Sequence, residues 1–134
     1  MKLTKTFGLL PALLLASSLL QAHTQVSKVV PGDGAVMHAA PATFELGFSE
    51  AVQLLKLVVT NAAGTVQPVD FKPVAKANKV FSIPLPPLVP TSYKVSWTIL
   101  GEDGHKVEGH VGFEVNPEAG EVVGTVPASG HDHH

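Results

Sequence analysis

Histidine is the residue type that stands out in this sequence. The chain of 134 residues contains seven histidines and no cysteine. No nucleophile–base spacing and no glycine-rich phosphate loop is found, so the chemistry that the histidines indicate is metal ligation. Imidazole nitrogens combined with carboxylate oxygens suit Cu(II) best among the common divalent metals.

His23 is the first candidate ligand because of the residues that precede it. Residues 1–22 have the layout of a secretory signal peptide, with lysines at positions 2 and 5, an apolar run from Phe7 to Leu15 and a small residue, Ala22, at the end. The cut site is only fair, since Leu20 stands where a small residue is preferred. Cleavage after Ala22 would make His23 the first residue of the exported protein. Its free amine and its ring Nδ1 would then chelate one metal ion.

The segment Asp103-Gly104-His105 offers a second pair of candidate ligands. Residues two apart in an extended segment project to the same side, and the intervening glycine lets the backbone bend so that both side chains converge. With His23 they would complete a set of nitrogen and oxygen ligands. Asp-Gly is also a common hairpin turn, so an ordinary turn is the alternative interpretation.

Most of the other candidates have two interpretations. Glu50 follows a predicted strand and is either a solvated carboxylate or a hydrogen-bond partner of a ligand histidine. His110 falls on the polar face of its strand, where it either faces solvent or has an auxiliary role. His38 is expected to be exposed, and Trp97 to pack in the core. The tail residues His131, Asp132, His133 and His134 either collect metal weakly or have no defined role.

The elements that must position these residues are predicted to be β-strands. Apolar residues alternate with polar ones, which is typical of half-buried antiparallel strands. Glycine and proline turn signals separate the strands, and no amphipathic helix is found. We therefore expect an all-β fold, an immunoglobulin-like Greek-key β-sandwich of about seven strands. The expected strands are Gln25–Val30, Thr43–Ser49, Leu54–Thr60, Val66–Phe71, Lys79–Leu85, Ser92–Ile99 and His110–Val115.

Composition excludes several classes of function. Residues 23–134 contain seven lysines, no arginine and eleven acidic residues, so a basic face for nucleic acid is not available. No apolar run reaches the ~18–20 residues of a transmembrane helix. Without cysteine, the domain must fold by burial alone, without disulfides. The domain organisation expected is a signal peptide (1–22), a single domain (23–116) and a flexible tail that contains histidines (117–134).

Three stretches together resemble the CopC family of periplasmic copper-resistance proteins. They are His23 as the mature N-terminus, FELGFSEAV (Phe44–Val52) and YKVSWTILGEDGHKVEGHVGFEV (Tyr93–Val115). The resemblance implies a Greek-key β-sandwich that holds one Cu(II) per chain on His23, Asp103 and His105. It also implies a periplasmic copper carrier or buffer rather than an enzyme, with a membrane copper-transport protein as a possible partner.

The sequence departs from the family pattern at three points. Many relatives have proline where this chain has Ala51 and Lys106, so both turns are expected to be less rigid. Some relatives carry a methionine-rich loop for Cu(I), whereas Met37 is the sole methionine after residue 22. The sequence therefore predicts no dedicated Cu(I) site.

Two other functions remain open at this stage. One is an immunoglobulin-like module that docks to a membrane copper-transport partner, with its copper residues incidental. The other is a copper-dependent oxidative enzyme, since a terminal histidine chelate is also the core of enzymes that cleave polysaccharides. Such enzymes present aromatic side chains to their substrate, whereas most of the eight aromatic residues here fall at predicted core positions.

Overall fold

The computed structural model describes Gly8 and residues 24–127. All regular elements in this part are strands, and none of these residues forms a helix long and apolar enough to cross a membrane. Among the candidate ligands, His23 and the tail histidines lie outside the described residues. The strands are β1 (Val26–Val30), β2 (Ala35–Met37), β3 (Thr43–Asn61), β4 (Asn78–Pro84), β5 (Ser92–Leu100) and β6 (Lys106–Val115).

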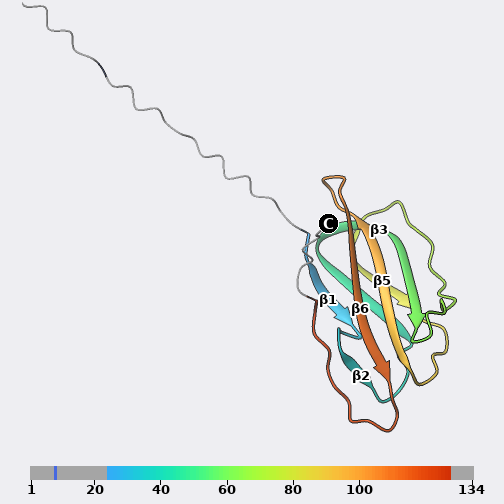
Figure 1. Ribbon diagram of the computed structural model, residues 1–134. Coiled ribbons are helices and arrows are strands. Elements are labelled where there is room, and N and C mark those ends of the chain that lie inside the picture. Colours follow the sequence, from blue (N-terminus) through green and yellow to red (C-terminus); the bar gives the residue numbers. More distant parts are fainter. Residues whose placement is uncertain (1–7, 9–23, 128–134) are drawn as a thin grey trace, which may run out of the picture.

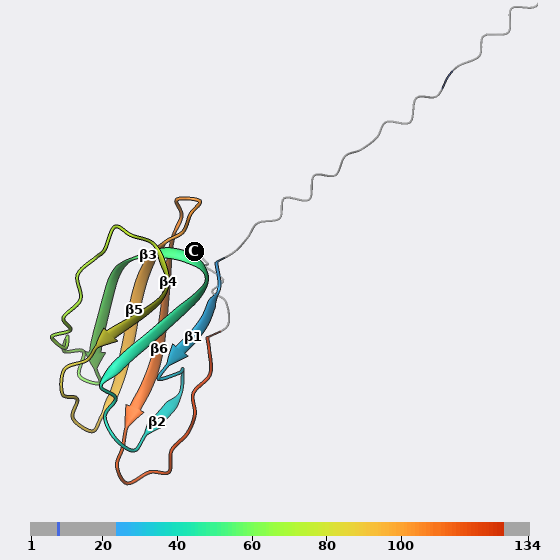
Figure 2. The ribbon, with the colours of Figure 1, turned by 180° about the vertical axis from the view of Figure 1, so that it is seen from behind.

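The long strand β3 joins two layers (Figures 1 and 2). Its first half pairs with β1 on one side and β4 on the other. Its second half pairs with β5, and the layer continues through β6 to β2. The first layer is thus β1-β3-β4 and the second is β3-β5-β6-β2. The predicted all-β sandwich is confirmed, with six strands among the described residues.

The core fills the space between the two layers. Phe44 of the first layer and Trp97 of the second are almost completely buried, with ring centroids 6.1 Å apart. Tyr93 stacks on Phe113 at 5.5 Å, and its hydroxyl donates a 2.6 Å hydrogen bond to the carbonyl of Val89. Burial raises the pKa of this Tyr93 hydroxyl. The prediction that Trp97 packs in the core is confirmed.

The structure corrects three of the expected strands. Thr43–Ser49 and Leu54–Thr60 are parts of the single strand β3. Val66–Phe71 is not a strand, apart from one isolated bridge between Val66 and Thr60. There the amides of Val69 and Phe71 donate to carbonyls two residues earlier, which is the pattern of γ-turns. Pro68 also has no N–H to donate to a ladder.

Residues 117–127, which we call the strap, return from the end of β6 along the outer edge of β2 (Figure 1). Val36 and Val122 exchange two backbone hydrogen bonds of 3.0 Å. Asp33 and Thr125 exchange another two, of 2.7 and 2.9 Å. The described part of the segment expected to be a flexible tail is therefore hydrogen-bonded to the sandwich.

Gly109→Ala is expected to destabilise the fold by about 1–3 kcal/mol, because the added methyl group overpacks the core. A Cβ on Gly109 would lie 2.5 Å from Cε2 of Trp97, whose indole is fixed between the layers. Gly112→Ala on the same strand is the control, since its nearest neighbour would be at an ordinary 3.7 Å. Urea denaturation measures both changes, and equal stability of the two variants would show that the contact with Trp97 is unimportant.

Candidate metal centre

The turn between β5 and β6 carries Asp103 and His105. The β5–β6 ladder continues up to the pair Leu100–Lys106. Beyond it, the amide of Gly101 donates to the carbonyl of His105 at 3.0 Å, and the amide of Gly104 donates to that of Gly101 at 3.0 Å. Gly104 has a φ of 82°, in the left-handed region that glycine tolerates without a steric cost. This is the geometry of a three-residue hairpin loop, and its own hydrogen bonds fix it without a proline at position 106.

Within this turn the two candidate ligands face each other. Oδ2 of Asp103 lies 2.8 Å from Nδ1 of His105, and Oδ1 accepts the His105 backbone amide at 3.1 Å. Both side chains are largely exposed to solvent. The hydrogen bond to His105 lowers the pKa of Asp103, and the same bond, together with the negative charge of Asp103, raises the pKa of His105.

The separation of the two donor atoms is suited to binding one ion. Bonds from a metal to imidazole nitrogen or carboxylate oxygen are about 2.0–2.2 Å long. Two such ligands at right angles around the ion are then about 2.8–3.1 Å apart. The observed 2.8 Å between Oδ2 of Asp103 and Nδ1 of His105 falls in this range. A dication bound by both atoms could therefore take the place of this hydrogen bond.

The beginning of the described chain lies against this turn. A Cβ built on Gly101 would meet Oδ1 of Asp103 at 3.0 Å and Oγ1 of Thr24 at 3.8 Å. Thr24, the first of the described residues 24–127, and Asp103, in the turn, therefore flank the same glycine. Figures 1 and 2 show the start of β1 at the same end of the sandwich as the β5–β6 turn. The residue that precedes Thr24 in the sequence is His23.

Ser49 fixes the chain just before β1. The Gln25 amide donates to Oγ of Ser49 at 2.9 Å, and the Ser49 amide donates to the Gln25 carbonyl at 2.8 Å. Sequence analysis did not identify this contact, although Ser49 lies within the stretch Phe44–Val52 on which the family resemblance rests. The pair of bonds holds the first described residues next to the turn.

Ser49→Ala is expected to weaken Cu(II) binding about 2–10-fold if the N-terminus contributes to the site. The lost hydrogen bond corresponds to about 0.5–1.5 kcal/mol, and without it the Thr24–Gln25 segment keeps only the hydrogen bond from the Ser49 amide to the Gln25 carbonyl. Ser82→Ala, at an exposed position on β4, is the matched control. Copper titration of the two variants checks this, and equal affinities would mean that this anchor does not position a ligand.

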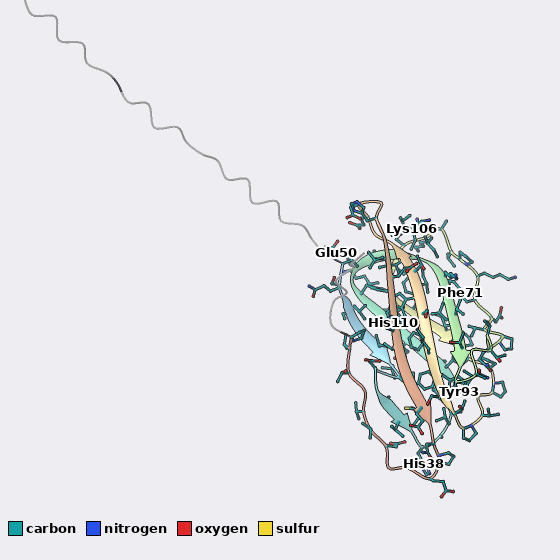
Figure 3. All side chains as sticks on the ribbon, in the orientation of Figure 1. His38, Glu50, Phe71, Tyr93, Lys106 and His110 are labelled. Atoms are coloured by element: carbon teal, nitrogen blue, oxygen red, sulfur yellow. The ribbon has the colours of Figure 1, made fainter. Side chains whose placement is uncertain are left out.

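The structure does not bring all of the candidate side chains together. Figure 3 shows Glu50 and Lys106 toward one end of the sandwich, His110 in its middle and His38 at the opposite end. Glu50 directly follows the anchoring Ser49, so it remains a candidate neighbour of the site. His110 pairs with Ser96 in mid-strand, five residues and roughly 17 Å along β6 from His105. It is exposed and is not brought to the turn.

Asp103 and His105 are the only two candidate ligands that the described residues place in contact. Across residues 24–127 no group of three His, Cys, Asp or Glu side chains is arranged to hold a metal ion. Two protein ligands alone make an open site, with positions left for further donors. The adjacency of Thr24 makes His23 the residue with the shortest path to the turn.

Comparison with known proteins identifies the family of this chain. The family model described as CopC domain matches residues 26–116. The chain is 35% identical over 121 residues to copper resistance protein C of Pseudomonas syringae pv. tomato, covering 84% of this chain and 95% of that protein. It is 29% identical to copper resistance protein C of Xanthomonas campestris pv. juglandis over 110 residues, with 75% and 86% coverage.

Solved structures show the same fold. CopC from Methylosinus trichosporium OB3b superimposes with a TM-score of 0.60 at 23% identity, covering 73% of this chain and 98% of that one. PcoC from Escherichia coli, described as a methionine-rich copper resistance protein, superimposes with a TM-score of 0.52 at 28% identity, with coverages of 71% and 100%. With the β-sandwich, the Asp-Gly-His turn and the family match in agreement, this chain belongs to the CopC family.

Proposed function

We propose that this protein is a periplasmic Cu(II) carrier or buffer that binds one copper ion per chain at the β5–β6 turn. The observation that carries the proposal is the 2.8 Å contact between Asp103 and His105, with Thr24 beside it. The relatives named for copper resistance support copper as the cargo.

The ligands we propose are His23, Asp103 and His105. His23 directly precedes Thr24, which lies beside Gly101 at the turn, and consecutive Cα atoms are ~3.8 Å apart. Cleavage of the signal peptide after Ala22 would leave His23 with a free amine. Its amine and imidazole, the His105 imidazole and the Asp103 carboxylate would form a tetragonal set of three nitrogens and one oxygen, which suits Cu(II).

The ion would be held by ligation and passed on, without a catalytic step. The Asp103–His105 pair is exposed, so a membrane copper-transport partner could reach the ion directly. A dedicated Cu(I) site is not part of the proposal, since Cu(I) favours thioether and thiolate ligands. Met37 is the sole methionine after residue 22, and it lies in β2 against the core.

Copper affinity is expected to fall steeply on acidification, and a Cu(II) titration at several pH values tests the proposal. The His105 imidazole must lose its proton to bind, and its raised pKa means that protons compete from a higher pH than for an ordinary histidine. Each competing proton weakens binding ~10-fold per pH unit below the pKa of its group. We expect one equivalent bound at pH 7.5 and a much lower affinity at pH 5.5. An affinity that does not change over this range would exclude imidazole ligands.

A further inference from the structure

The strap forms the outer edge of the second layer. That layer runs β3-β5-β6-β2, and the strap is hydrogen-bonded to the residues of β2 and of the turn before it. In both Figure 1 and Figure 2 the strap follows the margin of the sandwich, with no labelled strand beyond it. Its outer side therefore meets no other strand of the described chain.

Backbone groups of the strap face outward without a partner. Val122 bonds inward through both its amide and its carbonyl, and Thr125 does the same. In an extended chain the groups of successive residues point to alternate sides, so those of Val123 and Val126 face outward. Within residues 24–127 no backbone hydrogen bond involves Val123 or Val126. The strap thus offers free donors and acceptors to another strand.

The side chains at this edge are apolar and exposed. Val122, Val123 and Val126 are 52%, 92% and 45% exposed, and they make up three of the eight large hydrophobic side chains that are exposed among the described residues. Natural edge strands usually carry lysine or proline, which discourage pairing with another chain. Residues 119–126 contain neither. The edge is therefore suited to pairing rather than protected from it.

The charge around the strap has a single sign. Residues 107–127 contain four glutamates and no lysine or arginine. Glu118 and Glu121 lie in the strap itself and are exposed. No salt bridge within residues 24–127 involves either of them. A segment that pairs with the strap meets uncompensated negative charge, so a basic segment is favoured.

We propose that the outer edge of the strap binds an extended, basic segment of a partner protein as an added β-strand. Main-chain hydrogen bonds to Val123 and Val126 give such binding its affinity, and the alternate side chains of the added strand give it specificity. Apolar side chains of the segment would cover the exposed valines, and its lysines or arginines would face Glu118 and Glu121. The interaction does not depend on the proposed copper site.

The probe for this surface is the capped peptide acetyl-KVTVKVK-amide, and acetyl-EVTVEVE-amide is its control. Each peptide is added to the exported full chain without copper, at low ionic strength, where charges are least screened. Backbone amide signals are followed by NMR. We expect the basic peptide to shift the Val123 and Val126 signals and to slow hydrogen exchange of the Val123 amide. No shifts in the strap, or equal shifts with both peptides, would overturn the proposal.

Val123→Pro tests the backbone edge. Proline removes the outward amide, and the extended conformation of Val122 suits a residue that precedes proline. We expect the affinity for the basic peptide to fall about 2–10-fold, as for one lost hydrogen bond. Val123→Thr keeps the amide and the branched side chain, and it is expected to bind like the parent. Slow exchange of the Thr125 amide, which donates to Asp33, shows that the strap is still in place. Equal affinities of the two variants would contradict pairing through the backbone.

Glu121→Lys tests the charge and does not disturb the backbone, so it also decides if Val123→Pro releases the strap. We expect it to lower the affinity for the basic peptide about 3–10-fold, because a surface ion pair is replaced by repulsion, and to raise the affinity for the acidic peptide. Glu108→Lys is the matched control, the same change at an exposed position of β6, and it is expected to change neither affinity. Equal effects of the two variants would mean that the net charge of the protein selects the peptide, and would overturn a site on the strap.

Discussion

His105→Ala is expected to weaken Cu(II) binding by at least ~100-fold. Even partners that only orient a metal ligand cost about 10–100-fold when removed, and we propose that His105 is itself a ligand. Its ring is largely exposed at the tip of the turn, so the fold should be unaffected. The measurement is a competitive titration against a chelator of known affinity, made with the chain ending at Pro127 so that the tail histidines do not contribute.

His110→Ala is the matched control for this change. It removes the same kind of side chain from β6, the strand that follows the turn, also from an exposed position, and it leaves the turn intact. We expect its affinity to equal that of the parent. A loss of affinity in His110→Ala as large as in His105→Ala would mean that copper binds to the outer face of β6 rather than at the turn.

Adding one residue before His23 is expected to have a comparable effect, at least ~100-fold. The extension converts the terminal amine into an amide and removes the chelate ring that the amine forms with the imidazole. Once the imidazole of His23 has bound the ion, the amine of the same residue binds at little extra entropic cost. Loss of the amine therefore also weakens binding through the imidazole. An extension by one residue at the C-terminus is the control. If the N-terminal extension leaves the affinity unchanged, the terminal amine is not a ligand.

Most strands could be predicted because their side chains alternate locally. The merger of two predicted strands into β3 could not, because polar and small residues interrupt the pattern around Ser49–Ala51. The alternation also changes phase between Leu54 and Leu57, and the β3–β5 register shifts at that place. A β-bulge inserts one residue into a strand and moves the following side chains to the other face. The phase change was therefore a visible signal of a bulge within the second of the two predicted strands.

The metal centre was only partly predictable for a related reason. Asp103 and His105 are two residues apart, so turn chemistry alone brings them together. The contact of Gly101 with Thr24 and the hydrogen bonds between Ser49 and Gln25 join segments far apart in the sequence. They depend on how β1 and β3 pair and where β5 ends. Local sequence patterns do not show which distant segments come together. The family resemblance indicated this only for the proposed ligands His23, Asp103 and His105.

The strap was not predicted because its sequence shows no alternation. Its two bridges depend on Gly32 and Gly124, which are turn signals when each is considered alone. Their close approach is visible only in three dimensions. The strap also determines how the tail histidines can be removed without disturbing the fold, namely by ending the chain after Pro127 and not at Asn116.

The most direct test of the copper site is electron paramagnetic resonance of the protein exported through its own signal peptide, ending at Pro127 and loaded with one equivalent of Cu(II). We expect one tetragonal signal with three nitrogen ligands, which loses one nitrogen in His105→Ala. A heterogeneous signal, or one unchanged by His105→Ala, would contradict a copper centre built from His23, Asp103 and His105.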